Sequence, residues 1–280
     1  MRAVVFGAKG QLGRDLMTLL AAEGEVAGYD LPDFDIADGE ATLEIVSRFA
    51  PDVVVNAAAY TDVERAESER EAAFLANETG ARNAAAAAHS IGVPVVYYST
   101  DFVFGGEKAT PYETGEPVRP RGVYAESKAA GEQATREACE RHFIVRTAWL
   151  YGPGGNNFVE KILRAAQTRP SLKVVDDEVG SPTHTWDLAE ATCRLVKSDA
   201  YGDYHAVNAG ACSRFEFAKA ILEEAGLVTP VEPCSSDAFP TAAPRPKYSV
   251  LAVDKLESVT GYAMRPWREA LHAYMKRRET

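Results

Sequence analysis

Cysteine is scarce in this sequence, and its few copies are far apart. The 280 residues include four cysteines, at positions 139, 193, 212 and 234, and no two of them have CxxC spacing. The five histidines are equally scattered. These spacings exclude a recognisable zinc-binding pattern and a disulfide framework. We therefore expect free thiols in a reducing cytoplasm.

Long hydrophobic runs are absent. No stretch reaches the ~18–20 apolar residues that a membrane-spanning helix needs. The apolar part of residues 1–7 is too short for a signal peptide, and this segment is instead typical of a buried strand. We expect a cytoplasmic protein with no membrane partner.

Positive charge is also in short supply. Lys and Arg total 30 against 41 Asp and Glu, so the net charge is −11. Such a surface repels nucleic-acid backbones and anionic membranes, and any phosphate must be bound through local geometry. Hydrophobic residues at 46% and charged residues at 25% are typical of a globular chain, with a length that fits one large domain or two small ones.

Short apolar runs alternate with helical patterns in the first half. We expect strands at 2–6, 26–29, 52–56, 93–99 and 143–149, and helices at 12–22, 67–90 and 122–141. Continuous apolar strands between helices indicate a parallel sheet covered on both faces. The fold class is therefore α/β, with a doubly wound parallel sheet.

The pattern loosens after the glycine-rich stretch at 152–155. Helices are expected at 158–166, 187–196 and 215–224, with a short strand at 173–175, and prolines crowd the last third. We expect residues 1–150 to form the first domain and 151–280 a smaller C-terminal lobe. The chain should return to the first domain at about 187–208.

A glycine-rich turn joins the first strand to the first helix. Gly7, Gly10 and Gly13 have GxxGxxG spacing, which lets a backbone approach a pyrophosphate at the helix N-terminus. The same turn also fits a purely structural role. A dinucleotide site is favoured because Asp30 ends the second strand, where a carboxylate can accept hydrogen bonds from an adenosine ribose.

The identity of the dinucleotide stays open at this level. Asp30 favours NADH, because its charge would repel the 2′-phosphate of NADPH. Lys9 and Arg14 lie nearby in the sequence and could neutralise that phosphate. A solvated turn residue is the alternative role for Asp30.

Tyr124 and Lys128 are four residues apart on an expected helix, so they share one face. A free phenol has a pKa near ~10, and a neighbouring ammonium and an oxidised nicotinamide would lower it, which suits a general acid. Thr100 follows the fourth strand, at the sheet edge where ligands bind, and could hydrogen-bond a substrate carbonyl. The alternatives are a surface Tyr–Lys pair and a turn-capping threonine.

The set of Thr100, Tyr124, Lys128 and the glycine turn resembles the extended short-chain dehydrogenase/reductase superfamily. A more specific string of motifs runs nearly from end to end and resembles the dTDP-4-dehydrorhamnose reductases. These motifs are GQLG at 10–13, NAAAYT at 56–61, AES at 66–68, STDFVF at 99–104, YAESK at 124–128, RTAW at 146–149, GSPT at 180–183 and RPKYS at 245–249.

This resemblance implies a Rossmann-type domain that binds NADPH or NADH and a smaller C-terminal lobe that binds a nucleotide sugar. It implies hydride transfer to the C4 ketone of dTDP-4-dehydro-β-L-rhamnose, which gives dTDP-L-rhamnose in the last step of its biosynthesis. The implied catalytic residues are Thr100, Tyr124 and Lys128. The implied cofactor contacts are Gly7, Gly10, Gln11, Leu12, Gly13, Asp30, Asp35, Ile36, Ala59, Tyr60, Thr61, Tyr98, Tyr124 and Lys128. The implied substrate contacts are Thr100, Asp101, Trp149 and Arg245, the last of them at the diphosphate.

The sequence departs from the family pattern at two positions. Glu178 stands where the family often has glutamine, and Phe102 stands where tyrosine is common. Some relatives bind magnesium between subunits through acidic side chains, and Asp15 and Glu190 lie at comparable places. Because surface acids are common in so acidic a chain, the sequence does not support a metal.

Two other functions compete with the reductase. One is a nucleotide-sugar epimerase or dehydratase of the same superfamily, and the other is a non-catalytic subunit related to the regulatory subunit of methionine adenosyltransferase. A dehydratase typically has an Asp-Glu pair after its threonine, whereas Thr100 is followed by Asp101 and Phe102. The presence of Thr100, Tyr124 and Lys128 together favours catalysis, by a monomer or a homodimer.

Overall fold

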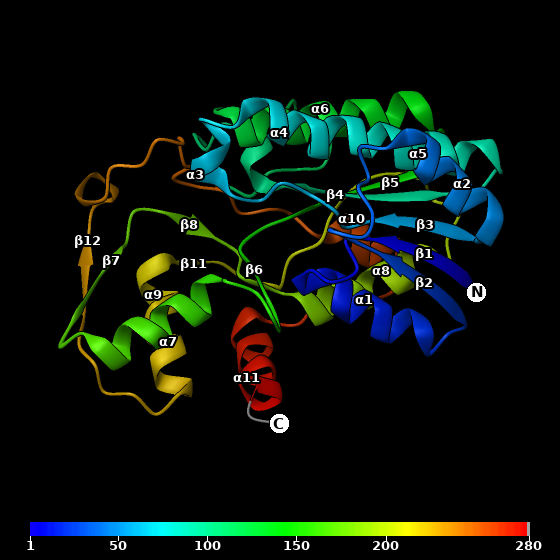
Figure 1. The fold of residues 1–280 in the computed structure, drawn as a ribbon. Coiled ribbons are helices and arrows are strands. Elements are labelled where there is room, and N and C mark those ends of the chain that lie inside the picture. Colours follow the sequence, from blue (N-terminus) through cyan, green and yellow to red (C-terminus); the bar gives the residue numbers. More distant parts are fainter. Residues whose placement is uncertain (279–280) are drawn as a thin grey trace.

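A six-stranded parallel sheet forms the centre of the protein, which we describe over residues 1–278 from a computed structural model (Figure 1). The strand order is β10-β5-β4-β3-β1-β2. The chain starts in the interior of the sheet, and the direction of winding reverses between β1 and β3, so the expected Rossmann-type doubly wound fold is confirmed. The strands are β1 (Arg2–Phe6), β2 (Glu25–Tyr29), β3 (Val53–Asn56), β4 (Val95–Thr100), β5 (His142–Thr147) and β10 (Gly202–His205).

Helices cover both faces of this sheet (Figure 1). Val5 points to one face and packs in a core with Leu16 and Leu188, whereas its neighbour Val4 packs in a separate core with Ala84 on the opposite face. This alternation explains why the strands are apolar along their whole length. The first face carries α1 (Gln11–Ala21) and α8 (Thr185–Leu195), and the second carries α2 (Gly39–Phe49), α5 (Gly80–Ser90) and α6 (Val123–Ala138).

The helix expected at 67–90 is confirmed over residues 70–90, which are helical without a break but include one π-helical turn. The structure has α3 (Val63–Ala66), α4 (Arg70–Phe74) and then a π-helical turn at Leu75–Thr79 before α5. In that turn the buried Asn77 side chain donates to Tyr60 O at 3.1 Å and to Ser127 Oγ at 2.9 Å, and it accepts from Tyr60 N at 2.9 Å. These three bonds account for a local departure from α-helical geometry that propensity alone does not indicate.

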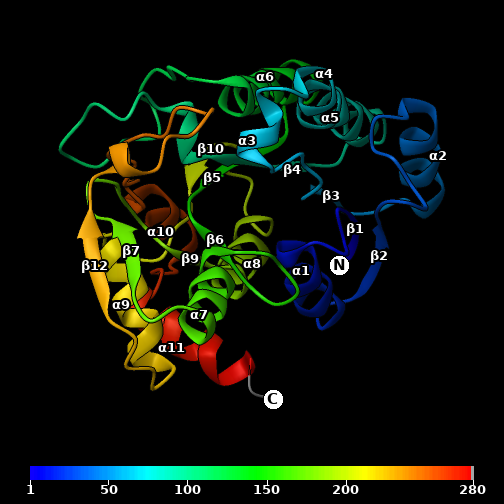
Figure 2. The same ribbon diagram turned by 60° about the vertical axis from the view of Figure 1, so that its left-hand side comes forward.

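The rest of the chain forms a second group of elements beside the sheet (Figure 2). Its core contains the buried aromatic residues Tyr151, Phe217 and Trp267. Its helices are α7 (Phe158–Thr168), α9 (Arg214–Glu224) and α11 (Trp267–Arg278), with α10 (Asp254–Thr260) beside α8. Its strand pairs are β6 (Leu150–Tyr151) with β9 (Thr183–His184), β7 (Leu172–Val175) with β12 (Val231–Cys234), and β8 (Val179–Gly180) with β11 (Cys212–Ser213).

Part of the later chain belongs to the central sheet. Helix α8 packs against α1, and β10 pairs with β5 from Gly202 opposite Phe143 to His205 opposite Arg146.

The structure differs from the sequence-based expectation in some elements. Helices α2 and α11 were not expected, and the fifth strand ends at Thr147 rather than at 149. Within residues 1–278 no helix is both long and apolar enough to cross a membrane. The four cysteines are all unpaired.

A buried ion pair fixes α6 to the sheet. Arg146, at the end of β5, donates to Glu132 of α6 through Nε at 2.8 Å and Nη2 at 2.7 Å, and the two side chains are 2% and 1% exposed. Although burial acts against the charge, the hydrogen bonds from Arg146 hold the pKa of Glu132 below its usual value. Asp203 of β10 and Arg136 complete the cluster. The helix that carries Tyr124 and Lys128 is thereby held in one register on the strands.

We expect Arg146→Met to lower the free energy of unfolding by about 3–5 kcal/mol, toward the lower value because Arg136 still faces Glu132. The matched control is Arg82→Met, which removes an exposed ion pair between α5 and α6 at 3.5 Å and should cost under about 1 kcal/mol. Urea denaturation at neutral pH measures both. Equal decreases in the free energy of unfolding of the two variants would contradict the structural role of the buried pair.

Candidate active site

A large cleft opens at the carboxyl ends of the sheet strands. Its volume is about 1440 Å³, and its walls include the ends of β1, β3 and β4 together with residues of α6, α7, β7 and α9. Every residue assigned to the site from the sequence lines this cleft except Tyr60. The Tyr60 hydroxyl instead donates to Glu69 Oε2 at 2.7 Å.

The glycine turn after β1 is packed closely against neighbouring backbone. Gly7 has φ of 80°, and a Cβ there would lie 2.5 Å from Ala58 N. A Cβ on Gly13 would lie 2.0 Å from Gly7 O. Gly10, by contrast, would meet only Gly7 O at 3.3 Å. Gly7 and Gly13 are therefore needed for the turn itself. Gly10 is the N-cap of α1 and no side chain caps the helix there, so the first N–H groups of α1 are left open.

Asp30 is held against the glycine turn. Its carboxylate accepts from Lys9 N at 2.7 Å and from Leu31 N at 2.8 Å, so its position in the cleft is fixed by backbone. The Lys9 ammonium is turned toward Asp33 at 2.6 Å. Arg14 Nε donates to Lys9 O at 2.9 Å. Asp30 thus presents a fixed negative charge at the end of β2.

Tyr124 and Thr100 meet at the floor of the cleft. Burial raises the pKa of Tyr124 to about 12, while a hydrogen bond with Thr100 acts in the opposite direction. The lowering expected from a neighbouring ammonium together with an oxidised nicotinamide is not present in the protein alone, and it stays a prediction for the cofactor-bound protein. The Thr100 hydroxyl also donates to Asp101 Oδ1 at 3.0 Å. Thr100 Oγ1 in turn accepts from Phe102 N at 3.2 Å, so this side chain also caps the short 3-10 turn at Asp101–Val103.

Lys128 lies one helical turn after Tyr124 and is almost completely buried. Its Nζ donates to Tyr98 O at 2.6 Å and lies 4.3 Å from the centre of the Tyr97 ring. Burial lowers the pKa of Lys128 to about 7, and the charge of Glu132 only partly compensates. Burial likewise raises the pKa of Asp101 to about 6, although hydrogen bonds to its carboxylate act against the rise. The protein alone thus disfavours charge at this end of the cleft.

Trp149 and two charged side chains, Arg214 and Glu178, also line the cleft. Arg214 Cζ lies 3.4 Å from the centre of the Trp149 ring, and Glu178 Oε2 lies 3.6 Å from Arg214 Nε. Arg245 is farther out, where Nη2 donates to Glu64 Oε1 of α3 at 2.9 Å. Cationic side chains thus line the part of the cleft away from the glycine turn.

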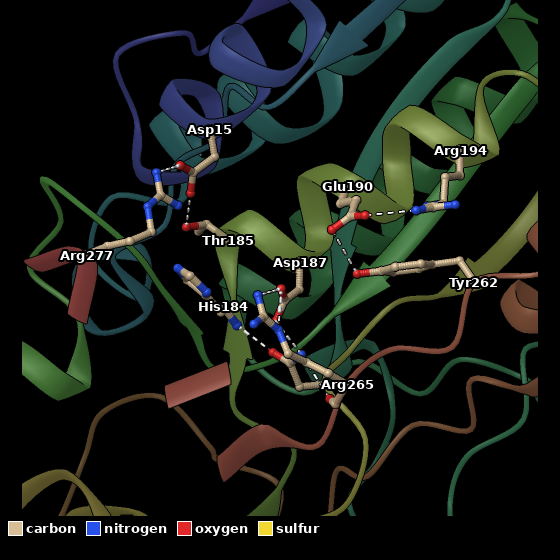
Figure 3. Close-up of polar contacts among 10 residues, drawn as sticks. Asp15, His184, Thr185, Asp187, Glu190, Arg194, Tyr262, Arg265 and Arg277 are labelled. Atoms are coloured by element: carbon tan, nitrogen blue, oxygen red, sulfur yellow. Dashed lines mark hydrogen bonds and ion pairs between the residues drawn. The ribbon is translucent and has the colours of Figure 1, made fainter. Parts of the chain in front are cut away.

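Asp15 and Glu190 do not face each other (Figure 3). Asp15 accepts from Thr185 Oγ1 at 2.6 Å and pairs with Arg277 at 3.3 Å. Glu190 pairs with Arg194 at 2.9 Å and accepts from Tyr262 at 3.3 Å. Over residues 1–278 no cluster of three or more His, Cys, Asp or Glu side chains is arranged to hold an ion.

Several residues that shape the site were not identified from the sequence. Glu132 lies four residues after Lys128, so helical spacing was a usable signal for a charged neighbour. Asn77 carries no such signal, because its role depends on the π-helical turn. Arg214 also carries none, because it is 65 residues beyond Trp149 in the chain and reaches it only through tertiary structure.

Comparisons with known proteins agree with this geometry. The family model described as "RmlD substrate binding domain" matches residues 1–280. The spore coat polysaccharide biosynthesis protein SpsK of Bacillus subtilis is 41% identical over 280 residues, covering 100% of this chain and 98% of that protein. The crystal structure of a dTDP-4-dehydrorhamnose reductase from Clostridium acetobutylicum is 39% identical, with a TM-score of 0.97 and 100% coverage of both chains.

A second solved structure is that of dTDP-4-dehydrorhamnose reductase from Bacillus anthracis in complex with NADP. It is 39% identical, with a TM-score of 0.96 and 99% coverage of each chain. The match extends over both the central sheet and the smaller group of elements beside it. The chain therefore belongs to the family of the RmlD substrate binding domain.

Proposed function

We propose that this protein reduces the C4 ketone of dTDP-4-dehydro-β-L-rhamnose to dTDP-L-rhamnose with hydride from NADPH or NADH. The observation that carries the proposal is the meeting of Tyr124, Thr100 and Lys128 at one end of a cleft that begins at the glycine turn. Relatives at 39% identity over the whole chain are named for this reaction. The same residues argue against a non-catalytic subunit.

The cleft fits a nicotinamide dinucleotide. The open backbone at Gly10 suits a pyrophosphate, and the fixed carboxylate of Asp30 suits an adenosine ribose. We assign the remaining contacts to Gln11, Leu12, Asp35, Ile36, Ala59, Thr61 and Tyr98, which line the same cleft. When bound, the reduced dinucleotide supplies the hydride, and a relative has been solved with NADP.

The proton comes from Tyr124 in this scheme. Because burial raises the pKa of Tyr124 to about 12, the phenol retains its proton until an alkoxide develops beside it. The Thr100 hydroxyl turns from Asp101 to donate to the ketone oxygen and so holds that oxygen in reach of Tyr124. Lys128, one turn away, holds the nicotinamide ribose and offers a positive charge that favours proton release from the phenol.

The substrate then lies on the side of the cleft opposite the glycine turn. We assign the sugar to Asp101 and Trp149 and the diphosphate to Arg245, whose guanidinium is matched to phosphate oxygens. Elements after residue 150 add Glu178, Arg214 and Arg245 to this wall, and we assign those elements outside the central sheet to a smaller substrate-binding lobe. The four unpaired cysteines suit a reducing compartment, and we place the enzyme in the cytoplasm.

Tyr124→Phe should reduce turnover by about 10²–10⁴-fold, because it removes the general acid and little volume. Affinity for the dinucleotide should stay close to that of the wild type. Steady-state consumption of NADPH with dTDP-4-dehydrorhamnose, together with a cofactor titration, measures both quantities. Tyr201→Phe is the control, since its hydroxyl bonds only to Asp199 at the surface. If Tyr124→Phe keeps a turnover near the wild-type value, Tyr124 is not the proton donor.

Asp30→Asn should raise the ratio of kcat/KM for NADPH to that for NADH by about tenfold, which corresponds to about 1.4 kcal/mol. The substitution removes the charge that repels a 2′-phosphate, while the amide oxygen can still accept from Lys9 N. The measurement is the same assay with each dinucleotide in turn. The assignment fails if the wild type does not use NADH at all, or if the ratio is unchanged in the variant.

A further inference from the structure

Trp149 has a backbone conformation that a tryptophan seldom adopts. Its φ is 48°, in the left-handed region, where a side chain with a Cβ costs about 1–3 kcal/mol. Such a conformation persists only where the surroundings hold it. Its carbonyl accepts one hydrogen bond, from Thr183 N at 3.3 Å. The indole must therefore be held by further contacts.

Gly180 makes one of these contacts. A Cβ at this position would lie 2.6 Å from Trp149 Cε2 and 2.8 Å from Trp149 Nε1. The indole thus packs directly against the backbone of β8. Any other residue at 180 would displace the ring.

Arg214 makes the other contact. Its Cζ lies 3.4 Å from the centre of the Trp149 ring, and its side chain is 16% exposed. A desolvated guanidinium over an indole is worth about 2 kcal/mol or more. Within residues 1–278 the Arg214 side chain makes no hydrogen bond, and its nearest carboxylate oxygen is Glu178 Oε2 at 3.6 Å. Arg214 Cζ also lies 5.3 Å from the centre of the Phe158 ring, so the indole is the nearer of the two rings that contact this largely buried cation.

The two contacts come from one rigid unit. Strands β8 and β11 pair with Cys212 opposite Gly180, and Arg214 is the first residue of α9, directly after β11. Ser213 caps this helix through a reciprocal capping box with Glu216, and its hydroxyl also bonds to Asp176 at 2.5 Å. Arg214 N donates to Glu178 O at 3.3 Å. The backbone that carries Arg214 is thus fixed relative to Gly180.

We propose that Arg214 is a positioning residue that clamps the Trp149 indole against Gly180 and so sets the sugar-contacting surface before substrate binds. Glu178 supplies the counter-charge that keeps the guanidinium at this buried place. The part of the proposal that concerns the sugar rests on the proposed function, whereas the ordering of the indole does not. A direct contact between Arg214 and the substrate is a different role, which the test below separates.

The kinetic test is a double-mutant cycle of Arg214→Met and Trp149→Ala. Arg214→Met alone should raise KM for dTDP-4-dehydrorhamnose about tenfold, with kcat and the KM for NADPH close to wild type. In the Trp149→Ala background the same substitution should have no further effect. If the double variant instead raises KM by the product of the two single-variant factors, the proposal is overturned, because Arg214 would then act on the substrate independently of Trp149. Lys219→Met, on the exposed face of α9, is the control.

The structural test follows the indole directly and needs no turnover. The chain has three tryptophans, so Trp186→Phe with Trp267→Phe leaves Trp149 as the one emitter. In that background Arg214→Met should shift the Trp149 emission and lower its fluorescence anisotropy, and Arg214→Lys should give an intermediate result. Unchanged emission and anisotropy in both variants would overturn the clamp. If the wild type does not reduce dTDP-4-dehydrorhamnose, the proposed function fails. The fluorescence measurement still tests whether Arg214 orders the Trp149 indole.

Discussion

The ion pair between Arg146 and Glu132 fixes the helix on which the proposed chemistry depends. Helix α6 carries Tyr124 and Lys128 near its start, and the pair holds it to β5 one turn beyond Lys128. Apolar packing alone would allow a helix of small residues to slide along a sheet, whereas a bidentate pair without water has one geometry. Asp203 extends the same cluster to β10, so the edge strand next to β5 also supports α6.

Burial is the second constraint on the site. It raises the pKa of Tyr124 and lowers that of Lys128, so burial shifts each group toward its uncharged form. A phenol with a raised pKa keeps its proton at neutral pH. A positive nicotinamide ring would favour the phenolate of Tyr124 and a developing alkoxide would favour the ammonium of Lys128, so a bound ligand changes both equilibria. The reactive state of the site is thus coupled to its occupancy.

Most of the central sheet could be predicted, because strands that are buried on both faces consist of continuous runs of β-branched residues. The glycine turn and the Tyr124–Lys128 pair were also accessible, since each depends on spacing within one element. The Arg214–Trp149 contact was not, because it forms only when β8 and β11 pair. The π-helical turn at Asn77 and the conformation of Trp149 likewise arise from tertiary contacts that override local preference. That burial raises the pKa of Tyr124 in the protein alone could not be predicted either, because burial depth cannot be read from spacing.

The pairing of β10 with β5 has a consequence for how the chain is made. The sheet cannot gain its last strand, nor α1 its cover from α8, until the ribosome has synthesised residues through about 205. By then α7, β7 and β8 have already been synthesised, so most of the smaller group of elements precedes the last strand of the sheet in the chain. A nascent chain that stops near residue 150 would leave β5 as an open edge, available to pair with other strands. Because the sheet is completed only by β10, the first 150 residues alone would present the edge of β5 without its partner strand.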